Sequence, residues 1–585
     1  MRDQLTALRH AMAAHGYDMY LVVSSDFHAS EYVGGHFMSR RWMSGFTGSA
    51  GELLVTPDWA GLWTDGRYFL QAAQQLEGSG IELMKQDQPG VPTVAEYILA
   101  HLGQGTLGFD GRTVSAARYR QFCKIGHVDG SHDLMDEIWA DRPALSAQPV
   151  FELPLSACGR SRADKLAQIR AAVKERGADE LLLSTLMDIC WLLNIRGGDV
   201  ACTPVVLSYL ALSADRCLLF INEETLSPEV RASLEADGVT VLPYDSFYAH
   251  IAAARPGTKL QLDPDTANSL MLQSVPAGVE LLELPSPTTL PKAMKNAAEV
   301  ANFREAHVRD GVAVTRFIYW LKHQIGREPM DELSVADKLE SFREEQPDYL
   351  GPSFTPIMGY AHHGAIVHYG ATPETSIPIE PRSFLLSDTG GHYLQGTTDI
   401  TRTISMGPLT QEERHMYTLV LKGHLRLGAA RFAYGVTGEA LDLLARMPLW
   451  AEGLDFRHGT GHGVGYILSV HEGPQRIRWA NKVGIPMEPG MITSDEPGMY
   501  LEGKFGVRLE DLTVCVEDEP TEFGRFLHLE YLTLVPWDRE AILPEELTDE
   551  EKGWLDAYHQ KVYETISPFL PAEEAAWLRE VTRAI

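Results

Sequence analysis

Hydrophobic positions in the first half of the chain follow a helix-then-strand pattern that occurs twice. Residues 5–18 (LTALRHAMAAHGYD) and 166–179 (LAQIRAAVKERGAD) carry apolar side chains at helical spacing and reach a glycine near their ends. An apolar strand follows each predicted helix, reading MYLVVS or ELLLST. A second strand, a turn at an aspartate and a third strand come later in each copy. Because core, glycine and aspartate positions keep one register, we interpret the copies as a duplicated α/β domain.

Proline-containing segments separate the parts of the chain. Pro143–Pro154 follows the first copy, and Pro285–Pro291 follows the second. The sequence therefore predicts an α/β (α+β) protein with three domains, at residues 1–148, 149–294 and 295–585.

The third domain is predicted to open on a long amphipathic helix. Residues 297–322 place apolar side chains on or near one face. His307 lies within this stripe, so we expect it to be a packed core residue and not a ligand.

Composition restricts the partners and the compartment. With 50 basic and 80 acidic residues the net charge is −30, which argues against nucleic acid or an anionic membrane as main partner. The chain lacks a run of about 18 apolar residues, so no membrane span is expected, and its first residues do not resemble a signal peptide. Six cysteines without a CxxC pair are typical of reduced thiols, which favours a cytoplasmic location.

Candidate metal ligands lie in order along the C-terminal half. They are Asp388, Asp399, His462, Glu496 and Glu510, in the segments DTGGHY, GTTDITR, HGTGHGVG, SDEPGMY and VRLED. Asp388 ends a strand-like stretch, and after a loop Asp399 lies within a second one, residues 397–403. Asp399, Thr401 and Thr403 are predicted to share one face of this second strand. The two glutamates end strand-like stretches separated by Pro-Gly, so we expect them to meet across a hairpin.

Four carboxylates and one imidazole form a hard, oxygen-rich ligand set. One divalent ion does not need four carboxylates, whereas two ions that share bridging carboxylates do. A pair of ions about 3.5–4 Å apart can generate a nucleophilic hydroxide and stabilise an oxyanion. The pattern therefore predicts a two-metal hydrolase.

Further histidines are concentrated in the same segments. His368 lies in AIVHYG, His458 precedes His462 in HGTGHG, and His471 lies in SVHEGP. Imidazoles there are suited to bonding a substrate carbonyl or a developing charge. The HGTGHG segment lacks the Gly-Lys-Ser/Thr ending of a phosphate-binding loop, so we reject that interpretation.

With these segments in view, the chain resembles the M24 metallopeptidases, which have the pita-bread fold, and among them the three-domain cytosolic Xaa-Pro aminopeptidases. RRWMSGFTGSAG and WTDGRYFLQAA match the first domain of that family, and WLLNIRGGDV matches the second. AIVHY, GTTDITRT, VLKGH, HGTGHGVG, VHEGP, SDEPGMY and VRLED match the catalytic domain.

The resemblance implies a distinct role for each metal ligand. Asp388 would bind one ion, Asp399 and Glu510 would bridge both, and His462 and Glu496 would hold the other. Glu496 would also act as the general base that assists the bridging water.

The resemblance also implies supporting roles around the metals. His368 and His471 would contact the substrate carbonyl region, and His458 matches an additional active-site histidine. Arg508 and Tyr500 match the supporting shell of the family. It further implies two Mn²⁺ ions (with Zn²⁺ or Co²⁺ as alternatives), a homodimer, peptide substrates with proline at the second position, and N-terminal domains that limit access from one side.

Departures from the family pattern are few. His362 and His363 are not part of it, and we expect both to be exposed loop residues. Asp511 stands where relatives often carry asparagine, which puts no catalytic residue in doubt.

Four alternatives share parts of this pattern. Prolidase cleaves Xaa-Pro dipeptides with the same ligands, but the duplicated first half disfavours it. Methionine aminopeptidase lacks the large N-terminal domains, and creatinase uses the fold without metals. A non-enzymatic peptide-binding module with the pita-bread fold would have lost ligands that this chain keeps.

Overall fold

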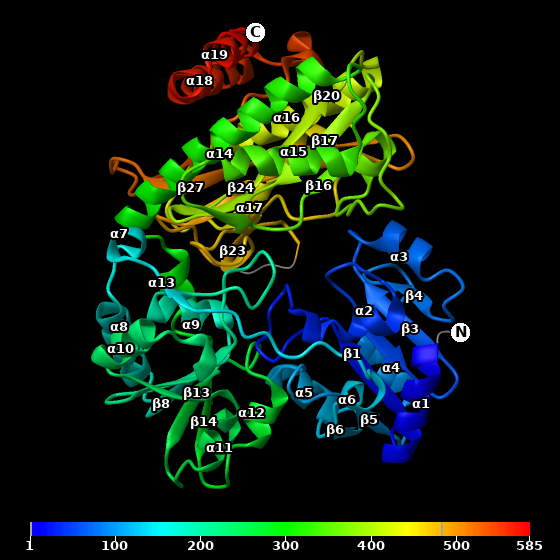
Figure 1. Cartoon of the computed structure of the whole chain (residues 1–585), viewed down its shortest axis with the longest axis vertical. Helices are drawn as coiled ribbons and strands as arrows, with labels where there is room; N and C mark the ends of the chain where they lie inside the picture. The colour runs from blue at the N-terminus through cyan, green and yellow to red at the C-terminus, as the bar shows by residue number, and fades with distance from the viewer. Residues whose placement is uncertain (1–2, 481–483) are drawn as a thin grey trace. The chain divides into compact units, whose positions relative to one another are not determined.

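The computed structural model describes residues 3–480 and 484–585, so the first two residues of the predicted first domain lie outside it. The chain forms two compact units (Figure 1). The first comprises Met1–Leu153 and Arg160–Thr289, and the second comprises Pro154–Gly159 and Leu290–Ile585.

The first unit contains two six-stranded sheets and the helices that flank them. Its strands are β1 (Met19–Val23), β2 (Glu52–Val55), β3 (Ala60–Thr64), β4 (Glu82–Lys85), β5 (Thr106–Gly108), β6 (His127–Asp129), β7 (Phe151–Glu152), β8 (Glu180–Leu183), β9 (Ile195–Arg196), β10 (Ser208–Ser213), β11 (Cys217–Ile221), β12 (Val239–Pro243), β13 (Lys259–Leu262) and β14 (Glu280–Glu283). Its helices are α1 (Asp3–His15), α2 (Ser39–Ser44), α3 (Phe69–Gln75), α4 (Val94–His101), α5 (Ala116–Cys123), α6 (Met135–Ile138), α8 (Arg162–Glu175), α9 (Leu186–Leu193), α10 (Pro228–Ala236), α11 (Phe247–Ala252) and α12 (Ser269–Gln273).

The two sheets have one topology. Their strand orders are β4-β3-β2-β1-β5-β6 and β12-β11-β10-β8-β13-β14. In both sheets the second to fourth strands of the order pair antiparallel, while the remaining neighbours pair parallel. The predicted duplication is therefore confirmed.

The same local structural features occur in both copies. Gly16 and Gly177, just beyond helices α1 and α8, have φ of 72° and 75°, a left-handed conformation that glycine adopts without steric cost. The aspartate turn also recurs: Thr56 Oγ1 donates to Asp58 in the first copy, and Ser213 Oγ donates to Asp215 in the second, each over 2.9 Å.

The second unit contains the candidate ligands. Its strands are β15 (Tyr349–Pro352), β16 (Ile357–Tyr360), β17 (Phe384–Thr389), β18 (Gly391–Tyr393), β19 (Gly396–Thr397), β20 (Ile400–Ser405), β21 (Arg431–Ala433), β22 (Gly461–Gly463), β23 (Glu472–Ile477), β24 (Ile492–Asp495), β25 (Gly498–Leu501), β26 (Phe505–Arg508), β27 (Asp511–Glu517) and β28 (Phe526–Tyr531). Its helices are α7 (Leu155–Cys158), α13 (Thr289–Ala293), α14 (Ala297–Gln324), α15 (Glu332–Glu344), α16 (Gln411–Gly428), α17 (Gly438–Trp450), α18 (Asp549–Ile566) and α19 (Ala572–Val581).

Within this unit the strands form a six-stranded sheet, β21-β28-β27-β24-β22-β23, and smaller sheets that include β16-β17-β20 and the β25-β26 hairpin. Helices α14, α15, α16 and α17 pack along the strands (Figure 1). The predicted helix at 297–322 is confirmed as α14, and His307 on it is fully buried, as expected of a core residue. No helix in residues 3–480 and 484–585 is long and apolar enough to cross a membrane.

The strand predicted at residues 397–403 is interrupted. Strand β19 ends at Thr397 and β20 begins at Ile400, so Asp399 lies in the break, and the expected loop after Asp388 contains the β18-β19 hairpin. The break has a physical cause: the Thr398 hydroxyl donates to buried Asp310 and accepts from Gly391 N, which takes Thr398 out of the β20 ladder.

Candidate metal centre

Two antiparallel strand pairs meet where the candidate ligands gather. Strand β17 pairs with β20, and β24 pairs with β27. A bridge between Thr401 and Glu510 joins the two pairs, with Glu510 N donating to Thr401 O over 3.1 Å. Residues more than 100 positions apart in sequence thereby enter one site.

Each carboxylate lies at or just beyond the end of a strand. Asp388 is the second-to-last residue of β17 and pairs with Thr401, and Asp399 immediately precedes β20. Glu496 follows β24, and Glu510 lies between β26 and β27. The glutamates face each other because Asp495 pairs with Asp511 on one side and Gly498 with Arg508 on the other, which refines the predicted hairpin.

His462 lies on β22, whose glycine neighbours permit close backbone approach. A Cβ at position 461 would come within 2.0 Å of Ser494 O, so only glycine fits there. His462 Nε2 lies 3.4 Å from Asp399 Oδ2 and 3.6 Å from Glu496 Oε1. One ligand atom each from Asp399, His462 and Glu510 falls within a mutual distance of 4.8 Å.

Threonines on β20 fix the opposite side of the site. Thr401 Oγ1 donates to Glu510 Oε2 over 2.7 Å, and Thr403 Oγ1 donates to Arg508 O over 2.9 Å. Thr401 and Thr403 lie on β20 as predicted and contact the 508–510 segment, whereas Asp399, predicted on the same strand face, lies just before the strand.

Burial and mutual repulsion make this a strained set of anions. Burial raises the pKa of Glu510 well above its usual range, and the charges of Asp399 and Glu496 add to the effect. Burial also raises the pKa of Glu496 to about 6. Burial alone would lower the pKa of His462, but the Asp399 hydrogen bond and the Glu496 charge raise it to about 9.

The ligand set fits divalent cations. Asp388 Oδ1 and Glu510 Oε1 are buried and accept no hydrogen bond from the residues that the structure describes. A buried carboxylate oxygen without a donor is costly unless a cation approaches it. Two divalent ions would satisfy these oxygens and remove the repulsion that raises the carboxylate pKa values.

A chain of hydrogen bonds leads from His458 to the ligands. His458 Nε2 lies 2.8 Å from Tyr500 Oη, and Arg508 Nη1 donates to the same oxygen over 2.8 Å. The second amine of Arg508 donates to Asp388 Oδ2. The structure therefore brings His458, Tyr500 and Arg508 together with Asp388, a candidate ligand, and their supporting roles stay predictions.

The two remaining histidines lie on different segments. The His471 ring packs edge-on against His462, with centroids 4.3 Å apart. His368 lies half-buried in the turn after a 3₁₀ helix, Ala361–Ala365, which packs against β26.

One carboxylate that sequence reasoning missed organises the segment around His368. Glu332, at the start of α15, is fully buried, and its Oε1 accepts from Tyr360 N over 2.8 Å. Its Oε2 accepts from Tyr369 Oη over 2.8 Å, and His363 Nδ1 lies 2.9 Å from Oε1. His362 is exposed as expected, and His363 is not, because it bonds the buried Glu332 carboxylate. Both histidines lie in the 3₁₀ helix and not in a loop.

A second buried network that the sequence did not reveal lies behind the glutamates. His424 on α16 donates from Nδ1 to Asp495 O over 3.1 Å, and its Nε2 lies 3.2 Å from Asp511 Oδ2. Arg402 donates to Asp511 Oδ1 over 2.7 Å and packs over the Trp537 ring. Asp511, next to Glu510 in sequence, is thus the ion-pair partner of His424 and Arg402. The one sequence feature that pointed to Asp511 was that relatives often carry asparagine at this position.

Comparisons with known proteins agree with this architecture. Residues 4–142 and 141–299 each match the creatinase/prolidase N-terminal domain, residues 301–517 match metallopeptidase family M24, and residues 525–585 match the C-terminal region of that peptidase.

Relatives match along the whole chain. Aminopeptidase P1 of Arabidopsis thaliana is 37% identical over 100% of this chain and 99% of its own. A probable Xaa-Pro aminopeptidase P of Laccaria bicolor is 37% identical over 99% of this chain and 92% of its own. The crystal structure of an X-prolyl aminopeptidase from Caenorhabditis elegans, described as a cytosolic enzyme with a di-nuclear active site, superposes with a TM-score of 0.94 at 33% identity, covering 100% of this chain and 99% of that one.

The chain therefore belongs to metallopeptidase family M24, in the group of the Xaa-Pro aminopeptidases P. Its fold is two creatinase-type N-terminal domains followed by a pita-bread catalytic domain.

Proposed function

We propose that this enzyme hydrolyses the peptide bond between an N-terminal residue and a following proline. The observation that carries the proposal is the retention of all five candidate ligands at one junction of strands, in a chain similar to Xaa-Pro aminopeptidases over its full length. A tertiary Xaa-Pro amide has no N–H, so a site built to accept the proline ring is chemically distinct from a general peptidase site.

Asp388, Asp399, His462, Glu496 and Glu510 would hold two divalent ions, with Asp399 and Glu510 placed to bridge them. The oxygen-rich set favours Mn²⁺, with Zn²⁺ or Co²⁺ as alternatives. Such ions supply Lewis acidity, which lowers the pKa of water and stabilises negative charge on a carbonyl oxygen.

The protein's own groups move protons and orient the substrate. Glu496 would take a proton from water and pass it to the leaving imino nitrogen, the general-base role that the family resemblance implies for it. His471, packed on His462, presents an imidazole for a hydrogen bond to the carbonyl oxygen as it gains charge. Both ring nitrogens of His458 are engaged, one with Gly459 O and one with Tyr500 Oη, so His458 would act by holding Tyr500. His368 would serve the same carbonyl region.

The Arg508 guanidinium positions a ligand and not the substrate. It pairs with Asp388 Oδ2 and donates to the Tyr500 hydroxyl through its other amine. Asp388 is thereby left with one free oxygen, Oδ1, as a ligand.

Prolidase activity is the alternative, and substrate length tests it. Mn²⁺-loaded protein would be offered a Xaa-Pro-Xaa tripeptide, a Xaa-Pro dipeptide and a Xaa-Ala-Xaa control, with release of the first residue measured. We expect the tripeptide to be cleaved and the alanine peptide to be spared. Preference for the dipeptide would favour prolidase, and no turnover with less than one metal ion per chain would exclude both.

Replacing one bridging ligand gives a sharper test. Asp399→Asn should reduce kcat by at least 10³-fold and lower bound metal below two ions per chain, because an amide oxygen cannot bridge two cations as a carboxylate does. Circular dichroism should remain that of the wild type.

Asp337→Asn, at an exposed position on α15, is the matched control and should keep full turnover. Retained activity in Asp399→Asn would contradict its bridging role.

We further propose domain boundaries at residues 1–148, 149–294 and 295–585, a cytoplasmic location and a homodimer. The family matches at 4–142, 141–299 and 301–517 support the boundaries. The Caenorhabditis elegans relative, which is described as a cytosolic enzyme, and the six free cysteines support the cytoplasmic location. An exposed apolar stripe on α17, formed by Leu443, Met447 and Trp450, supports a self-association surface.

A further inference from the structure

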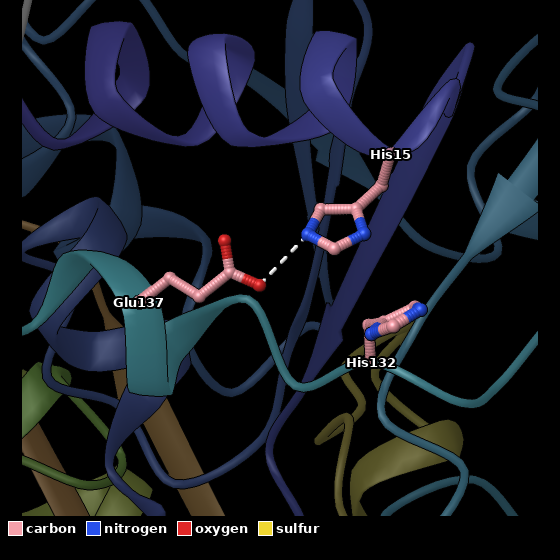
Figure 2. A group of neighbouring side chains, drawn as sticks. All are labelled: His15, His132 and Glu137. Atoms are coloured by element: carbon pink, nitrogen blue, oxygen red, sulfur yellow. Dashed lines mark hydrogen bonds and ion pairs between the residues drawn. The ribbon is translucent and has the colours of Figure 1, made fainter.

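A second group of metal-ligating side chains lies in the first domain, apart from the catalytic ligands. His15 ends helix α1, His132 lies in the segment after β6, and Glu137 lies on α6 (Figure 2). One ligand atom from each falls within 4.8 Å of the others, and His15 Nε2 is 2.8 Å from Glu137 Oε1. Three donors from three separate segments therefore converge on one point.

The backbones that carry these donors are anchored in the core. Tyr20 Oη donates to His132 O over 2.9 Å and accepts from Leu134 N over 3.0 Å. Leu134 and Met135, which precede Glu137, are buried in the cluster that also contains Met12 of α1. The positions of the donors are therefore fixed, whereas their side chains are half-buried or exposed and accessible to an ion from solvent.

The local charge favours a cation. Glu137 is accompanied by Asp129, which accepts hydrogen bonds from Tyr17 Oη over 2.8 Å and from the backbone of Ser131 over 2.9 Å. Burial would raise the pKa of Asp129, but these bonds and the neighbouring His132 hold it below the usual value, so Asp129 stays ionised at neutral pH. Asp129 therefore adds a second negative charge near His132.

The donor chemistry specifies the ion. Two imidazoles and one carboxylate form a ligand set typical of zinc, which binds them at about 2.0–2.2 Å and leaves a fourth position for water. Ligand atoms at that distance from a tetrahedral ion lie about 3.4 Å apart. The ligand atoms of these three side chains already lie within 4.8 Å of one another, so small side-chain rotations would bring them to that spacing. The catalytic set, with four carboxylates, has the opposite preference for hard ions.

We propose that His15, His132 and Glu137 form a zinc site that is independent of the catalytic metals and ties α1 to α6. The His15–Glu137 hydrogen bond by itself would need no metal, so His132 distinguishes the two interpretations. Its ring lies 4.3 Å from that of His15 at an interplanar angle of 42°, beside the pair. The proposal requires His132 to contribute to zinc binding.

Zinc counting tests the proposal in the full-length, Mn²⁺-loaded enzyme. Wild type and His132→Ala would be dialysed against the same micromolar free Zn²⁺ at pH 7.5, and zinc and manganese per chain would be counted by mass spectrometry. We expect His132→Ala to hold one zinc ion fewer per chain than wild type, with equal manganese. Exchange at the catalytic site affects both proteins alike, so the difference isolates the new site.

Two further variants complete the design. His127→Ala removes an exposed histidine of the same domain and should bind as much zinc as wild type, whereas Glu137→Gln should bind it at least ten-fold more weakly. Zn²⁺ should raise the melting temperature of wild type more than that of His132→Ala, and both should turn over a Xaa-Pro-Xaa peptide equally. Equal zinc content in wild type and His132→Ala would overturn the proposal.

Discussion

Two fully or almost fully buried histidines of the catalytic unit show how neighbours decide the charge of a residue. Burial lowers the pKa of His424, but Asp495 and Asp511 on either side more than compensate and raise it to about 9. Burial, together with the charges of the nearby Arg539 and Arg402, lowers the pKa of His559 to about 3. His424 is therefore an imidazolium within an ion network, while neutral His559 accepts a hydrogen bond from Trp537 N over 3.1 Å.

The low pKa of His559 predicts an acid-sensitive stability. Below about pH 6.5 the unfolded chain protonates this histidine and the folded chain does not, so stability falls as pH decreases from about 6.5 toward 3. Between pH 6.5 and 5 the loss is about 2 kcal/mol, from about 1.4 kcal/mol per pH unit. His559→Gln keeps an acceptor for Trp537 N without a titrating group.

Urea unfolding of the enzyme, followed between pH 8 and pH 5, measures this effect. The urea midpoint of His559→Gln should depend less on pH than that of wild type. The control His323→Gln, at the C-terminal end of α14, should have the pH dependence of wild type. Identical pH dependence in His559→Gln and wild type would show that another group is responsible.

At the scale of elements, the segment between β16 and β17 has little regular structure and yet carries His368. Its conformation depends on the first residue of a helix, Glu332, which binds Tyr360, His363 and Tyr369. The segment also lies against β26 so closely that a Cβ at Gly506 would come within 1.7 Å of Gly364 O. A helix start and a strand thus hold the loop that presents His368.

We predict that Glu332→Gln lowers kcat/KM for a Xaa-Pro-Xaa peptide by about ten-fold, or about 1.4 kcal/mol. The amide brings an N–H group toward donors that need an acceptor, so the segment loses its fixed conformation. Bound metal should remain at the wild-type level, because the described hydrogen bonds of Glu332 go to Tyr360, His363, Tyr369 and Ile377 and not to a candidate ligand.

Exposed Glu328→Gln is the matched control and should have wild-type kinetics. If Glu332→Gln loses metal and activity together, the defect lies in the metal centre and not in the His368 segment.

At the scale of the whole molecule, a net charge of −30 keeps copies apart unless a specific apolar surface joins them. Leu443, Met447 and Trp450 project from one side of α17 with exposed fractions of 42%, 53% and 40%. The Trp450 ring contacts that of Trp479, itself 48% exposed, at a centroid distance of 6.2 Å. Contiguous exposed apolar side chains on an acidic protein are typical of an interface.

Met447→Glu should convert the proposed dimer into a monomer at micromolar concentration, because it places a charge within the apolar stripe. Sedimentation equilibrium measures the mass. Leu99→Glu, on an apolar residue of α4 that is 64% exposed, is the control and should leave the mass unchanged. A monomeric wild type would contradict the proposal of a dimer.

The sequence by itself determined the elements and the chemical character of the site. Helical and strand periods act over a few residues, so the duplicated domain, helix α14 and the order of the ligands could be predicted from local patterns. The residue types of the candidate ligands also indicated two hard cations before any distance between the ligands was known.

Only the tertiary structure decided which groups meet and with what charge. Arg508 reaches Asp388, Thr401 reaches Glu510, and Glu332 reaches His363 through pairings between distant segments. A pKa depends on burial and on charges within a few ångströms, so the opposite states of His424 and His559 could not be read from the chain. The inward position of His363 and the group of His15, His132 and Glu137 follow from the same cause: side chains far apart in sequence become neighbours only when the chain folds.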